Sequence, residues 1–269
     1  MKRIYLNLKR FDIPREMGGI NDTGMREQYA RKIVSEIEKL SQDFMFTVFF
    51  QEAYVLPATD VARRTHIGCQ GVYEKDVEKG GNFGGMTTFR TAKSMKALGV
   101  DSVIIGHCEE RAYLNGILSA GGGQGDVNEI LNREIRCAVN AGMNVLYCIG
   151  EKSEEQQYRF DVLTHQLETG LKDVDLTNVA IAYEPVWAIG VGKIPPDRQY
   201  IEEIVEHVKS VYNLPVVYGG GLKEQNAEML AGIEKLDGGL IALTRFGSDF
   251  GFYLEDFNKI VETYQGGLK

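Results

Sequence analysis

The sequence is poor in cysteine, proline and tryptophan, and it carries no excess of positive charge. Its 269 residues include four cysteines, six prolines and one tryptophan, and the formal net charge is −8. None of the cysteines forms a C-x-x-C pair, which predicts no thiolate metal site and instead favours buried thiols in a reducing cytoplasm. The acidic balance argues against nucleic acid or an anionic membrane surface as a partner.

Long apolar runs are also missing from the chain. No stretch approaches the ~20 apolar residues that a membrane-spanning helix needs. The first residues are basic, but no apolar segment of the kind found in secretory signals follows them. We therefore expect a cytoplasmic protein that has no membrane partner.

Short β-branched and aromatic runs alternate with longer amphipathic segments along the whole chain. This alternation is typical of repeated βα units around a parallel sheet. The candidate strands are IYLNL, FMFTVFF, HIGCQ, SVIIGH, NVLYCIG, NVAIAYE, PVVYGGG and GGLIAL. Helical stripes of apolar residues recur over 26–40 and 196–212, whereas 115–126 is too rich in glycine for a helix or strand. No linker divides the chain, so we expect one domain over 1–269.

Eight βα units favour a closed (β/α)8 TIM barrel over an open doubly wound sheet. The dinucleotide fingerprint G-x-G-x-x-G does not follow the first strand. The Gly-x-Gly-Lys fragment at 190–193 lacks the upstream glycine spacing and the hydroxyl residue of a phosphate-binding P-loop. The sequence therefore predicts a barrel without a nucleotide cofactor.

Polar residues stand where several of the expected strands end. The first strand ends at Asn7 and Lys9, the fourth at His107, the sixth at Glu184 and the seventh at the glycines 219–221. The carboxyl ends of parallel strands meet at one rim of a barrel, which is where active sites of this architecture lie. Exposed glycine amides can hold phosphate oxygens. The pattern indicates acid–base chemistry on a small anionic substrate.

Four motifs in this order make the chain similar to the triosephosphate isomerase family. They are LNLK, VIIGHCEER, AYEPVWAIGVGK and YGGG. The resemblance runs from residue 4 to about residue 245 and implies interconversion of dihydroxyacetone phosphate and glyceraldehyde 3-phosphate without a metal or organic cofactor. It also implies a homodimer.

The resemblance assigns a role to each matching residue. Glu184 would be the base, His107 and Lys9 would stabilise the enediolate, Asn7 would orient the substrate near Lys9, and Glu109 would support the site. Taken alone, each has a structural alternative: a helix-capping glutamate, a core histidine, a surface lysine.

Binding of the substrate phosphate is assigned to backbone amides. Gly190, in the lid segment 185–193, and Gly219 and Gly220 after the seventh strand would donate to it. We expect Trp187 to anchor the lid by packing. The acidic run that begins at Glu151 is typical of a solvated helix start, although Glu151 also matches the CxGE pattern of the family.

Three other histidines show no spacing that would suit a metal, so we expect structural roles for them. They are His66, His165 and His207.

The sequence departs from the family pattern at the phosphate and at the dimer loop. Gly221 replaces a serine, and Ala242 and Leu243 stand where the family has two glycines. Arg245 follows, as either a phosphate ligand or an exposed residue. Gly84 replaces a threonine that reaches the partner subunit.

Further changes follow the histidine, where Cys108 replaces a serine and Glu110 an arginine. These departures leave two alternatives to a triose phosphate isomerase. The first is an isomerase of a four-carbon ketose phosphate such as erythrulose phosphate, and the second is a sugar-phosphate-binding protein without catalysis.

Overall fold

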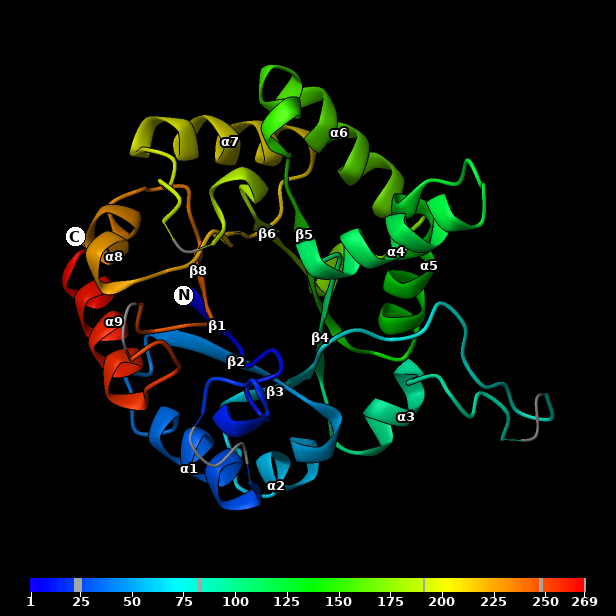
Figure 1. The fold of residues 1–269 in the computed structure, drawn as a ribbon, viewed down its shortest axis with the longest axis horizontal. Helices are drawn as coiled ribbons and strands as arrows, with labels where there is room; N and C mark the ends of the chain where they lie inside the picture. The colour runs from blue at the N-terminus through cyan, green and yellow to red at the C-terminus, as the bar shows by residue number, and fades with distance from the viewer. Residues whose placement is uncertain (22–25, 82–83, 191, 247–248, 269) are drawn as a thin grey trace.

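Eight parallel strands form a closed barrel in the order β1 to β8, as the sequence pattern predicted (Figure 1). The computed structural model describes residues 1–21, 26–81, 84–190, 192–246 and 249–268. The strands are β1 Lys2–Asn7, β2 Phe44–Phe50, β3 His66–Cys69, β4 Ser102–Ile105, β5 Asn144–Ile149, β6 Val179–Tyr183, β7 Val216–Tyr218 and β8 Gly238–Ile241. β1 pairs with both β2 and β8, which closes the ring. All the carboxyl ends therefore face one rim.

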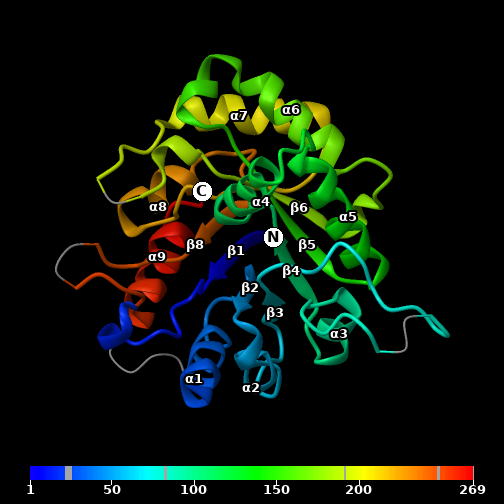
Figure 2. The ribbon, with the colours of Figure 1, turned by 45° about the vertical axis from the view of Figure 1, so that its right-hand side comes forward.

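Helices surround the barrel, and both views show them outside the strands (Figures 1 and 2). In the described part of the chain they are α1 Glu27–Ile37, α2 Val55–Thr59, α3 Ala92–Ala97, α4 Cys108–Ala120, α5 Val127–Asn140, α6 Arg159–Gly170, α7 Arg198–Val211, α8 Glu224–Ala231 and α9 Leu254–Gly266. None of the described helices is both long enough and apolar enough to cross a membrane.

The helices pack on the sheet through the apolar stripes that the sequence predicted. On α7, the side chains of Ile201, Ile204, Val205 and Val208 are all buried. Burying an aliphatic side chain of this size contributes about 1.5–3 kcal/mol each. The helix begins where Asp197 accepts a hydrogen bond from the Tyr200 backbone N–H at 2.9 Å. Such an N-cap satisfies an amide that has no partner within the helix.

A second apolar cluster fills the inside of the barrel. Tyr5 and Phe49 stack there with their ring centroids 5.9 Å apart, above smaller residues of β5 and β6. Gly68 on β3 makes room for this pair, because a Cβ at that position would lie 2.3 Å from a Phe49 ring carbon. The interior is therefore packed, and only the rim is left for chemistry.

The expectation that 115–126 contains no helix was wrong for its first half. α4 continues through Ala120, and the turn follows only at Gly121 and Gly122. The single glycine inside this helix, Gly116, costs about 1 kcal/mol. Leu114 and Leu118 offset that cost by packing, partly buried, on the main core.

Candidate active site

Two residues at the end of β1 form the first part of the site. Asn7 is buried, and its Oδ1 accepts the Lys9 backbone N–H at 3.0 Å and the Gln70 amide at 3.2 Å. Lys9 has a φ of 41°, a left-handed backbone conformation that is uncommon for residues other than glycine. The Gln70 amide also donates to the Lys9 carbonyl, at 2.9 Å. These bonds hold the unusual turn that directs Lys9 over the rim.

Lys9 reaches across the rim to Glu109, on the first turn of α4. Lys9 Nζ and Glu109 Oε1 are 2.7 Å apart. Burial opposes ionisation of Glu109, but the Lys9 ammonium outweighs it and lowers the pKa of this carboxyl. The ion pair therefore joins the ends of β1 and β4.

His107 follows β4 and caps α4. Its Nδ1 accepts the Glu109 backbone N–H at 3.3 Å, at the amino end of the helix. A ring nitrogen that accepts from an amide carries no proton, so this contact assigns the proton to Nε2. Nε2 is 3.5 Å from Glu184 Oε1. His107 therefore presents an N–H donor at the mouth of the barrel.

Glu184 follows β6 and lies almost completely buried, with 2% of its side chain exposed. Its Oε2 accepts the Cys108 backbone N–H at 2.9 Å. Burial raises the pKa of Glu184, and the opposing influences of His107, the Cys108 amide and Lys9 offset the increase only in part. A buried carboxylate with a raised pKa is a stronger base than an exposed one.

The segment after Glu184 is fastened at its root by a buried carboxylate. Trp187 donates its indole N–H to Glu151 Oε1 at 2.7 Å, and Tyr183 and Tyr200 donate to the same oxygen at 2.9 Å each. Trp187 also packs edge-on against Tyr200. Packing of Trp187 is thus confirmed, whereas the solvated helix start expected at Glu151 was wrong, since Glu151 is fully buried.

The tip of that segment contains two glycines in left-handed conformations. Gly190 has a φ of 125° and Gly192 a φ of 78°. Val191, between them in the lid motif, lies outside the described residues.

Glycines after β7 pack closely against Glu184 and Tyr218. The Gly219 backbone N–H, expected to bind phosphate, instead donates to the Tyr183 carbonyl at 2.6 Å. A Cβ at Gly219 would lie 2.8 Å from Glu184 Cγ, and one at Gly220 would lie 2.3 Å from the Tyr218 hydroxyl. Only glycine permits this approach. The backbone N–H groups of Gly220, Gly221 and Leu243 donate to no acceptor within the described ranges. Unpaired amides from the ends of β7 and β8 therefore remain for an anion.

Arg245 does not point toward these amides. Its guanidinium lies 3.0 Å from a Glu255 oxygen and 2.6 Å from an Asp256 oxygen, and it stacks on the Tyr253 ring at 3.8 Å. Arg245 is thus neither a phosphate ligand in this arrangement nor a residue without partners, because it holds the start of α9.

One group of side chains among the described residues has the spacing of a metal site, and it is the one just described. Ligand atoms of His107, Cys108 and Glu184 lie within 4.8 Å of one another. Burial raises the pKa of the Cys108 thiol to about 12, and Glu184 Oε2 is already engaged by an amide. A protonated thiol is a poor ligand, so this set favours proton transfer over metal binding.

The other three histidines have structural partners. His66 contacts Asp101 at 2.7 Å, His165 contacts Asp126 at 2.8 Å, and His207 contacts Thr164 at 2.9 Å.

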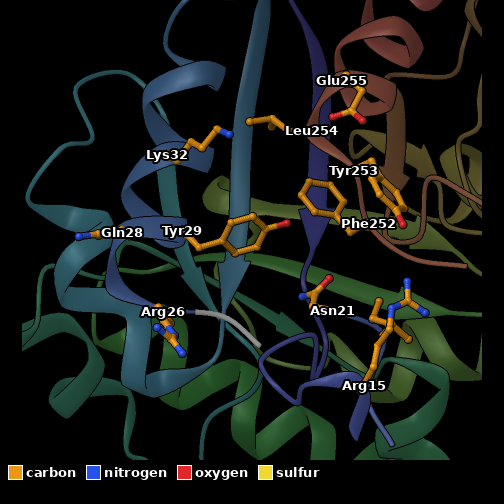
Figure 3. A pocket seen from close by; sticks show the side chains of 11 residues that line it. Arg15, Asn21, Arg26, Gln28, Tyr29, Lys32, Phe252, Tyr253, Leu254 and Glu255 are labelled. Atoms are coloured by element: carbon orange, nitrogen blue, oxygen red, sulfur yellow. The ribbon is translucent and has the colours of Figure 1, made fainter. Parts of the chain in front are cut away.

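A separate cavity of about 430 Å³ lies between the first βα loop and the start of α9 (Figure 3). Tyr29 of α1 points across it toward Phe252, and Lys32 points toward Leu254. No residue assigned to catalysis lines it. The chemistry of the rim, rather than the size of a cavity, locates the candidate site.

Sequence reasoning missed Gln70, whose side-chain amide donates to Asn7 Oδ1 and to the Lys9 carbonyl. Gln70 closes the expected third strand HIGCQ, so the rule used for Asn7 and Glu184 would have found it.

Comparisons with known proteins agree with this geometry. The family model "Triosephosphate isomerase" matches residues 20–263. The triosephosphate isomerase of Prosthecochloris aestuarii is 34% identical over 209 residues, which cover 73% of this chain and 74% of that protein. That of Geobacter metallireducens is 38% identical over 157 residues, and the match spans 53% of this chain and 59% of that protein.

A solved structure gives the same result for the fold. The crystal structure of triosephosphate isomerase from Bartonella henselae has a TM-score of 0.72 and 26% sequence identity, and the match covers 98% of this chain and 99% of that one. Together with the matched family model, this likeness shows that the chain belongs to the triosephosphate isomerase family.

Proposed function

We propose that this protein interconverts dihydroxyacetone phosphate and glyceraldehyde 3-phosphate. The observation that carries the proposal is the approach of His107 Nε2 to Glu184 Oε1, 3.5 Å apart at the carboxyl rim, with Lys9 adjoining through Glu109. Membership of the family and the names of the relatives support it.

In the proposed reaction Glu184 removes a proton from the carbon beside the substrate carbonyl. The electrons of the broken C–H bond form the C=C bond of an enediolate, whose oxygens gain negative charge. The Nε2–H of His107 donates to these oxygens, and the Lys9 ammonium stabilises them. The proton of the adjacent hydroxyl passes to the former carbonyl oxygen by way of His107 Nε2, so that the second oxygen becomes the new carbonyl. Glu184 returns its proton to the neighbouring carbon, which completes the isomerisation.

Glu184 has to move before it can act. One carboxylate oxygen is held by the Cys108 amide, and the 3.5 Å gap to His107 leaves no room for a substrate. Closure of the segment that includes Gly190 would carry Glu184 toward the substrate and exclude water. In this proposal the amides of Gly190, Gly220 and Gly221 bind the phosphate, while Asn7 keeps Lys9 in place. The Gly219 backbone N–H takes no part, because it already donates to the Tyr183 carbonyl at 2.6 Å.

Deuterium exchange tests the proposal directly. In D2O, solvent deuterium is expected on a substrate carbon by NMR when either triose phosphate is added, and Glu184→Gln should abolish it. Glu168→Gln, an exposed carboxylate on α6, is the matched control. Exchange with erythrulose phosphate but with neither triose phosphate would favour the four-carbon alternative. Phosphate binding without any exchange would favour the non-catalytic alternative.

We further propose a homodimer that forms through the face around 73–90. Its described residues, 73–81 and 84–90, project away from the barrel beyond α3 (Figure 1). At its base Tyr73 and Phe89 stack at 3.9 Å, and exposed apolar groups of Tyr113 and Ile117 lie beside a cavity of about 730 Å³. Exposed apolar surface of this kind favours a protein partner. Gly84 leaves open space in the segment.

Sedimentation velocity on wild type and Tyr113→Asp tests the dimer. The proposal expects a dimer for the wild type and a weakened one for the variant. A monomeric wild type at micromolar concentration would contradict it.

The cysteines are consistent with the proposed cytoplasmic location. All four are free, and burial raises the pKa of both the Cys69 and Cys108 thiols to about 12. Thiols of this kind persist in a reducing compartment.

A further inference from the structure

Lys223 lies beside the loops that follow β7 and β8. Its Cε is 3.4 Å from the place where a Cβ on Gly221 would be, and its Nζ is 4.1 Å from the centre of the Phe246 ring. The Leu222 backbone N–H donates to the Leu240 carbonyl at 3.0 Å, which joins the loop after β7 to strand β8. The Lys223 side chain therefore lies between Gly221, whose backbone amide is unpaired among the described residues, and Phe246 of the loop after β8.

The surroundings of Lys223 leave its charge without a counter-ion. Burial lowers the pKa of Lys223, and no carboxylate of the described residues opposes that effect. The contact with the Phe246 face stabilises a cation without neutralising it. A partly buried ammonium in this condition gains free energy when an anion binds to it.

The local backbone makes room for this lysine. Gly221 has a φ of 94°, which side-chain-bearing residues rarely adopt, and the Lys223 side chain packs beside it. The Lys223 backbone N–H donates to Asn226 Oδ1 at 2.8 Å, while the Asn226 amide donates to the Gly221 carbonyl at 3.0 Å. The loop conformation that presents Lys223 is thus fixed at both ends.

We propose that Lys223 binds the phosphate group of the substrate and replaces the donors lost at Gly221 and at Ala242–Leu243. The inference rests on the proposed function. It makes Lys223 a residue that determines specificity for substrates with a phosphate monoester group. A lysine suits this task because its compact charge needs no fixed geometry, whereas Arg245 is already committed to α9. The loss of one serine hydroxyl and of close glycine contacts is compensated by a full positive charge.

Steady-state kinetics with Lys223→Met tests the inference. Removing one charge-assisted contact should raise the KM for glyceraldehyde 3-phosphate and the inhibition constant of inorganic phosphate by about 10- to 100-fold, while kcat changes less. Lys223→Arg keeps the charge and should restore part of the affinity. Lys235→Met removes an exposed lysine paired with Glu206 and is the matched control.

The outcomes separate the inference from the proposed function. A KM and a phosphate inhibition constant within about two-fold of wild type in Lys223→Met would overturn the inference while leaving the isomerase intact. If the wild type exchanges no deuterium with any short sugar phosphate, the proposed function fails. Calorimetric titration with inorganic phosphate then still tests Lys223: weaker binding by the variant supports the inference, and equal or absent binding overturns it.

Discussion

Replacing Glu134 by glutamine should stabilise the protein at alkaline pH. Glu134 lies on α5 with 7% of its surface exposed, and its Oε2 is buried with no donor among the described residues. Its carboxyl group is within hydrogen-bonding reach of Glu110, which is partly buried. Burial first, and then Glu110, raise the pKa of Glu134 to about 9 from 4.5. The pair therefore holds a proton at neutral pH.

The sign of the effect follows from proton binding. Between pH 4.5 and 9 the unfolded chain has released the Glu134 proton and the folded chain has kept it, so stability falls as pH rises. At 1.36 kcal/mol per pH unit the loss reaches up to about 5 kcal/mol at pH 8. Glutamine donates to Glu110 as the protonated acid does, but it cannot ionise. The gain in the free energy of unfolding from Glu134→Gln is therefore near zero at about pH 4 and grows as the pH rises toward 9.

Urea unfolding of both proteins at about pH 5 and about pH 8 measures the difference. Protein concentration is held constant, since a dimer couples stability to concentration. Glu168→Gln on α6 controls for the loss of an exposed carboxylate. A Glu134→Gln free energy of unfolding that matches wild type at both pH values, or a gain that shrinks as pH rises, would refute the reasoning.

Three more substitutions test the rim and the scaffold. Gly219→Ala places a Cβ 2.8 Å from Glu184 Cγ, so kcat should fall by about 100-fold with the fold retained; unchanged steady-state kinetics would contradict this. Trp187→Phe removes the donor to Glu151 and should lower stability by about 1–3 kcal/mol in denaturant titrations, and an unaltered midpoint would show that the bond contributes nothing. Asp197→Ala removes the α7 cap and should cost about 1 kcal/mol of stability without changing kcat/KM; a loss of activity would mean that the cap acts on the site.

The barrel could be predicted from the sequence because its strands are buried on both faces and are bounded by turns. Each of the eight apolar runs coincides with an observed strand. Strand ends also indicated the rim, since parallel strands bring their carboxyl ends together whatever their separation in sequence. His107 and Glu184 are 77 positions apart in the chain, and the structure brings their side chains to 3.5 Å. Their catalytic roles stay predictions.

Features that depend on tertiary contacts could not be predicted in the same way. The glycines after α4 obscured a helix that Leu114 and Leu118 stabilise by packing on the core. Glu151 belongs to an acidic run in the sequence, and nothing local indicates that three aromatic side chains from β6, the lid and α7 bury it. The direction of Arg245 was set by acids on α9, which sequence spacing alone does not reveal.

Three donors share one oxygen of Glu151. We therefore expect mutations to be harmful at this position as well as at the residues proposed to contact the substrate. Glu151→Gln would put an amide where three hydrogen-bond donors share one acceptor oxygen. Glu151→Ala would leave the three donors buried without an acceptor. In a saturation screen for growth, we expect position 151 to tolerate as few replacements as position 184. Glu151 variants that can be purified should show a lower melting temperature before they show a lower kcat. That order would distinguish a residue that holds the lid in place from one that takes part in proton transfer.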